Sequence, residues 1–132
     1  MSVSEAVPIL KRLIPGLAAV YVFGSESRGD TRPDSDLDLA FVADPPVSAS
    51  LVEGARQALE LALGRDTDLV DLSRVSAILA RQVLIDGDRI AAFRPSVADL
   101  LEVRLMRDYE DLKYRRAGIE SDIAERGRVL AQ

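Results

Sequence analysis

Two apolar runs in the first half of the chain predict a pair of strands joined by a polar segment. The runs are Leu17–Phe23 and Leu37–Val42. Short, near-continuous apolar runs bounded by turn residues are typical of buried strands. Pro15-Gly16 precedes the first run, and Asp44-Pro45-Pro46 follows the second at a point where proline ends the ladder of hydrogen bonds.

Helical spacing of apolar residues predicts helices before and after this pair. Ser4 is placed to cap a first helix that reaches about Ile14, and Pro8 is tolerated if that helix starts late or is kinked. A second helix is expected from Ser48 or Ser50 to about Leu63, because Gly64 is a good C-terminal stop.

The second half of the chain repeats the alternation of strand and helix. Thr67–Leu72 and Ile90–Phe93 are predicted strands, and Ser73 is expected to cap a helix through about Ile85. Ser96 with Asp99 resembles a capping box for a long helix from Val97 towards Arg116 or Leu130. The order of elements indicates an α+β (mixed α/β) domain with one sheet, and residues 1–132 are predicted to form a single domain.

Composition excludes several classes of site. The chain has neither histidine nor cysteine, so a general base has to be a carboxylate, lysine or tyrosine, and disulfides and zinc–cysteine sites are absent. The net charge of −5 argues against direct nucleic-acid binding as the main activity. No apolar run is long enough to span a membrane, and residues 1–12 lack the layout of a signal peptide, so a cytoplasmic location is expected.

The polar segment between the first two strands carries the candidate chemistry. Asp36 and Asp38 are two residues apart, so a strand directs both carboxylates to the same face. Carboxylates held close together repel each other unless a cation or a shared proton intervenes, and oxygen ligands suit Mg²⁺. Two solvated charges on a sheet edge are the alternative reading. Gly24-Ser25 ends the first strand, where a glycine lets the backbone approach a ligand.

Together these residues resemble the motif of the nucleotidyltransferase superfamily that includes DNA polymerase beta. Gly24-Ser25 is followed after ten residues by Asp36-Leu37-Asp38, with a strand on each side. The residues between them, Arg28-Gly29 and Pro33-Asp34-Ser35, are similar to the minimal nucleotidyltransferase (MNT) antitoxins that pair with HEPN-domain toxins. The resemblance implies a nucleotidyltransferase core of about four strands, with helices packed against the sheet and a long C-terminal helix.

A third carboxylate is expected on the strand Thr67–Leu72. Asp68 and Asp71 are three residues apart and face opposite sides of a regular strand, and periodicity does not choose between them. The resemblance favours Asp68, because the family's third acid lies in a Val-Asp-Leu-Val-like strand that Thr67-Asp68-Leu69-Val70 matches except at Thr67. Asp71 is then a strand-end acid with a capping role.

The resemblance also implies the roles of these residues and the partners of the protein. Asp36, Asp38 and Asp68 would bind Mg²⁺ and catalyse transfer from ATP, and Gly24, Ser25 and Arg28 would hold the nucleotide's phosphates, although Arg28 could equally be a solvated loop cation. The acceptor would be a tyrosine of a HEPN-family RNase toxin. Tyr109 and Tyr114 mark the candidate docking surface on the long helix. The alternatives are an antitoxin that acts by contact alone and a small-molecule nucleotidyltransferase of the aminoglycoside-modifying kind.

Overall fold

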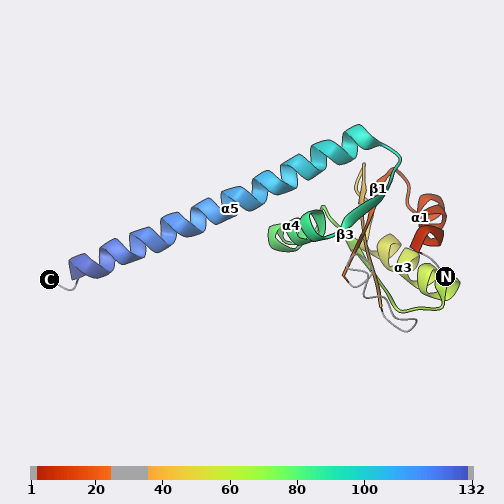
Figure 1. Cartoon of the computed structure of the whole chain (residues 1–132), viewed down its shortest axis with the longest axis horizontal. Helices are drawn as coiled ribbons and strands as arrows, with labels where there is room; N and C mark the ends of the chain where they lie inside the picture. Colours follow the sequence, from red (N-terminus) through yellow and green to blue (C-terminus); the bar gives the residue numbers. More distant parts are fainter. Residues whose placement is uncertain (1–2, 25–35, 131–132) are drawn as a thin grey trace.

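A four-stranded sheet with helices on both faces makes up the core of the protein (Figure 1). The structure is a computed structural model that describes residues 3–24 and 36–130, with side chains described as far as Gly118. Its strands are β1 (Leu17–Phe23), β2 (Leu37–Ala43), β3 (Thr67–Asp71) and β4 (Asp88–Ala92). Its helices are the 3₁₀ turn η1 (Val3–Glu5), then α1 (Ala6–Leu13), α3 (Ala49–Leu63), α4 (Ala77–Asp86) and α5 (Pro95–Leu130).

The sheet is mixed, with the strand order β3-β2-β1-β4. β1 pairs antiparallel with both β2 and β4, whereas β2 pairs parallel with β3 through the crossover helix α3. The two central strands are the two apolar runs of the sequence. The predicted α+β fold, with one sheet and a long C-terminal helix, is confirmed.

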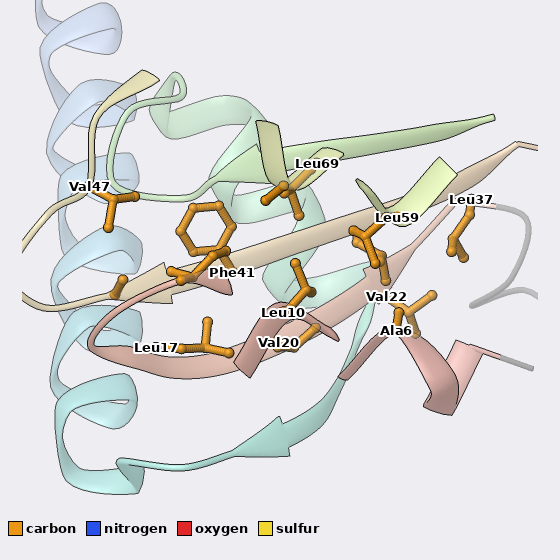
Figure 2. Close-up of a cluster of buried hydrophobic side chains, with 14 of the residues drawn as sticks. Ala6, Leu10, Leu17, Val20, Val22, Leu37, Phe41, Val47, Leu59 and Leu69 are labelled. Atoms are coloured by element: carbon orange, nitrogen blue, oxygen red, sulfur yellow. The ribbon is translucent and has the colours of Figure 1, made fainter. Parts of the chain in front are cut away.

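Helices cover the two faces of the sheet in pairs, which explains why β1 and β2 are apolar on both sides. On one face α1 and α3 close a cluster whose labelled side chains converge in Figure 2; Phe41, Leu10 and Leu59 are fully buried there. On the other face α4 and α5 pack on a second cluster around Tyr21, Ala40 and Val42. α5 then continues well beyond the sheet (Figure 1).

Three predicted helix starts are wrong. α1 begins at Ala6 with Glu5 at its N-cap, so Ser4 lies in the preceding turn and Pro8 falls in the first helical turn, where proline is tolerated. α4 is capped by Ser76, whose Oγ accepts from Leu79 N at 3.2 Å, and starts later than Ser73 predicts. α5 starts at Pro95, a favoured first position, which places Ser96 inside the helix.

The middle of the chain follows the sequence more closely. Ser48 caps α3 by accepting from Leu51 N, and Gly64 ends that helix in the left-handed conformation at φ +67°. Among the described helices, none combines the length and the hydropathy that crossing a membrane requires.

Candidate active site

The end of β1 and the start of β2 meet at a cavity of about 550 Å³. Register pairs Phe23 with Asp38, so the residue after Phe23 lies beside the Asp38 side chain. That residue is Gly24, at φ +72°, and a Cβ built on it would lie 2.2 Å from Asp38 Oδ2. Glycine is favoured there, because the left-handed backbone strains any other residue and a Cβ would displace the Asp38 carboxylate.

Asp38 and Asp68 are direct neighbours across the parallel pair of β2 and β3. Neighbouring strands lie about 4.8 Å apart, so two carboxylates in register can reach one ion. Asp38 lines the cavity on the face of the sheet that α4 covers. Asp68 and Val70 are two residues apart on β3 and therefore point to the same face, and Val70 packs on the face that α4 covers. Asp68 is exposed, and Asp36, also exposed, precedes Asp38 by two residues.

Asp71 faces the other side of β3 and is buried, with 6% of its surface exposed. Its Oδ1 accepts from the backbone N of Ser73 at 3.0 Å and from Ser73 Oγ at 2.7 Å. Arg74 Nε lies 3.7 Å from its Oδ2 and a further guanidinium nitrogen of Arg74 donates to the carbonyl of Val47. Asp71 therefore shapes the turn after β3 and does not reach the cavity. Its contact with Ser73 also explains why the cap of α4 falls on Ser76.

The start of β3 is held by α3 through Glu60. Glu60 Oε1 accepts from the backbone N of Thr67 at 3.1 Å and pairs with Arg56 at 2.5 Å. Thr67 is buried at 2% exposure, and its hydroxyl donates to the carbonyl of Arg65 at 3.2 Å, so a polar residue is satisfied at a position where the family pattern has an apolar one. This contact fixes the residue immediately before Asp68.

The far wall of the cavity comes from α4, which the sequence did not link to the site. Gln82, Ile85 and Asp86 line it together with Phe23. Gln82 and Asp86 are four apart and therefore share one helix face, so the polar pair was a signal available in the sequence. In the structure α4 buries Ala80 and Val83, whereas Ile78 is 48% exposed.

The described residues fit a magnesium ion in part. No three acidic side chains of the described ranges lie close enough to form a complete metal site. Mg²⁺ usually takes only one or two carboxylates from the protein and fills its remaining positions with water and substrate phosphates. The in-register pair Asp38 and Asp68 meets that requirement. Ser25 and Arg28, the other predicted phosphate ligands, lie outside the described residues.

Comparison with known proteins identifies the family to which this fold belongs. The family described as polymerase beta, nucleotidyltransferase, matches residues 5–93, from the N-cap of α1 to just past β4. This chain belongs to that nucleotidyltransferase family. The resemblance to minimal nucleotidyltransferase antitoxins that the sequence indicated is confirmed.

Relatives of this nucleotidyltransferase match over nearly the whole chain. Protein adenylyltransferase MntA of Shewanella oneidensis is 31% identical over 120 residues, which are 91% of this chain and 86% of MntA. A chain of a crystal structure described as a toxin–antitoxin with AMP-PNP aligns at a TM-score of 0.81 and 30% identity, over 94% of this chain and 99% of the other. A chain from tri-AMPylated Shewanella oneidensis HEPN toxin in complex with MNT antitoxin aligns at 0.73 and 29% identity, over 92% and 94%.

Proposed function

We propose that this nucleotidyltransferase is an antitoxin that transfers AMP from ATP to a tyrosine of a HEPN-family toxin and so inactivates it. The observation that carries the proposal is the register of Asp38 with Asp68 beside a cavity that Gly24 keeps open. The similarity to MntA and to the AMP-PNP and AMPylated-toxin complexes supports the choice of donor and acceptor.

The reaction exchanges one P–O bond for another and transfers one proton. The tyrosine oxygen attacks the α-phosphorus of ATP, the bond from that phosphorus to the bridging oxygen of the β-phosphate breaks, and pyrophosphate leaves. The hydroxyl proton passes to a carboxylate base, since the chain has no histidine. Asp68, exposed on the cavity side of β3, is the candidate base.

Of the three carboxylates predicted to hold Mg²⁺, the in-register pair Asp38 and Asp68 is the part that the fold supports, and Asp36 stays a predicted third ligand. Bound Mg²⁺ neutralises phosphate charge and orients the phosphates for in-line attack. Gly24 leaves room for the phosphates beside Asp38, and Ser25 and Arg28 are the proposed residues that contact them. Because the reaction consumes ATP and acts on an RNase, we propose a cytoplasmic location.

Mass spectrometry of the toxin tests this function. The full-length protein is incubated with ATP, Mg²⁺ and a HEPN-family toxin encoded next to it, and we expect the toxin to gain the mass of one or more AMP groups on tyrosine. A stable complex with an unmodified toxin would contradict the enzymatic function and favour neutralisation by contact. Nucleotidylation of an aminoglycoside, with the toxin unmodified, would favour the small-molecule alternative.

A further inference from the structure

The two walls of the active-site cavity differ in chemistry. Gly24 and Asp38 form the wall assigned to phosphates and metal, whereas α4 contributes an amide, an apolar side chain and a carboxylate from Gln82, Ile85 and Asp86. We propose that Gln82 contacts the base of the donor nucleotide and selects adenine over guanine. This inference rests on the proposed function, because it takes the cavity as the site of the donor nucleotide.

The position of Gln82 is fixed by the way α4 is anchored at both ends. Ser76 caps its start, and Gly87 ends it in close contact with β1. A Cβ at Gly87 would lie 2.6 Å from the carbonyl oxygen of Val22, so the last turn approaches the strand as closely as only glycine allows. Val83, next to Gln82, is buried at 1% exposure. Gln82 is therefore presented to the cavity from a rigid element and not from a loop.

The cavity is large enough for the base as well as the phosphates. Its volume of about 550 Å³ lies within the range of about 300–1,000 Å³ that is usual for ligand pockets. With the phosphates at Gly24 and Asp38, the sugar and base extend towards the opposite wall, which α4 supplies. Ile85 is 54% exposed and offers an apolar surface for the face of a base.

Hydrogen-bonding chemistry determines which base this wall favours. A glutamine amide carries a donor and an acceptor side by side, which match the N7 acceptor and the N6 amino donor of adenine. Guanine presents two acceptors, N7 and O6, on the same edge. Asp86 lines the same wall one helical turn after Gln82, and the preference for adenine follows from the amide of Gln82 alone.

Calorimetric titration of the full chain with AMP-PNP and with GMP-PNP in Mg²⁺ tests the inference. We expect the wild type to prefer AMP-PNP, and Gln82→Ala to bind AMP-PNP about 5- to 150-fold more weakly with little change for GMP-PNP. Gln82→Leu, which keeps the bulk of the side chain, should lose the preference in the same way. Gln57→Ala on the outer surface of α3 is the matched control and should keep it.

Two results would overturn the inference. One is an unchanged ratio of the two affinities in Gln82→Ala and Gln82→Leu, and the other is a wild type without preference. In transfer assays with the toxin, Gln82→Ala should raise KM for ATP and leave kcat nearly unchanged. A raised KM for the toxin, with an unchanged ratio of the AMP-PNP and GMP-PNP affinities, would instead place Gln82 at the acceptor. The titrations do not depend on AMP transfer. If the Gln82 variants lose the preference for AMP-PNP, the inference is supported even when the wild type modifies no toxin. A wild type that modifies no toxin would contradict the proposed function but not this inference.

Discussion

At Gly24 two requirements for glycine coincide, and they can be separated by comparison with Gly64. Both residues have positive φ, at +72° and +67°. A Cβ on Gly64 would meet nothing within 4 Å, whereas a Cβ on Gly24 would strike the Asp38 carboxylate. A substitution at Gly64 therefore measures the cost of the backbone conformation alone. A substitution at Gly24 measures that cost together with the displacement of Asp38.

We predict that Gly24→Ala and Gly64→Ala each lower the free energy of unfolding by about 1–2 kcal/mol, the cost of the left-handed conformation. The Asp38 side chain can move aside, so the extra contact at Gly24 affects function more than stability. Gly24→Ala should therefore lose AMP-PNP binding while Gly64→Ala keeps it. Urea unfolding and calorimetry measure both effects. Equal nucleotide affinities in the two variants would show that the phosphates bind elsewhere.

Tyr21 makes the stability of the protein sensitive to alkaline pH. It is 2% exposed, and burial, followed by the negative charge of Glu102, raises the pKa of its hydroxyl well above the usual value. The unfolded chain releases this proton near pH 10 whereas the folded protein retains it, so stability is complete below that pH and falls above it. Urea unfolding from about pH 9 to 11 should show a steeper loss for the wild type than for Tyr21→Phe. Parallel curves would contradict this assignment.

At the scale of elements, the local pattern of apolar residues was sufficient to predict the bounds of a strand where both faces of that strand are buried. The apolar runs gave β1 without error and β2 to within one residue, and Ser48 and Gly64 marked the ends of α3. The start of α4 was missed because Ser73 and Ser76 are equally good caps in sequence. Which serine caps α4 depends on Asp71, because Asp71 accepts hydrogen bonds from Ser73. That contact depends on which face of the sheet Asp71 points to.

In the candidate site, too, the local sequence predicted some features and only the folded structure shows the others. Alternation placed Asp68 and Asp71 on opposite faces of one strand, but only the pairing of β2 with β3 shows which of them lies beside Asp38. The sequence shows Gln82 and Asp86 as a polar pair on one face of a helix, but their place at the cavity depends on packing between elements distant in sequence. The catalytic and binding roles of these residues remain predictions.

Gly87 controls how closely α4 approaches the sheet. Its φ of −93° suits any residue, but a Cβ there would lie 2.5 Å from Val83 O and 2.6 Å from Val22 O, both backbone atoms. We predict that Gly87→Ala destabilises the protein by about 1–3 kcal/mol and weakens AMP-PNP binding, because the end of α4 has to move. Gly54→Ala in α3, where a Cβ meets nothing, should stabilise by up to about 1 kcal/mol. Similar thermal shifts in the two variants would contradict the close packing of α4.

At the scale of the whole molecule, the candidate surface for the toxin lies on α5 and shares no described residue with the lining of the nucleotide cavity. Its first turns pack on the sheet, where Leu105 is 8% exposed, and its later turns run beyond it (Figure 1). Tyr114 is 82% exposed, and a hollow of about 470 Å³ nearby is lined by Ile78, Tyr109, Leu112, Lys113, Arg116 and Ala117. The Arg81 guanidinium stacks on the Tyr109 ring at 4.7 Å and holds it in place.

We predict that Lys113→Glu combined with Tyr114→Glu weakens toxin binding and toxin AMPylation but leaves AMP-PNP affinity unchanged. The physical reason is that both residues are exposed on α5 and neither lines the nucleotide cavity. Leu61→Glu, an equally exposed apolar position on α3, is the control and should bind the toxin normally. Normal toxin binding by the double variant would show that the partner docks on another surface.

The most direct test of the account compares Asp68→Asn with Asp71→Asn in single-turnover transfer of AMP to the toxin. Asp68 lies exposed beside Asp38 and Asp71 is buried beneath the turn to α4, so the two variants remove the same charge from opposite faces of β3. We expect Asp68→Asn to abolish transfer with the fold intact, and Asp71→Asn to lower stability while the folded fraction still transfers AMP. Wild-type transfer by Asp68→Asn, or a folded but inactive Asp71→Asn, would contradict it.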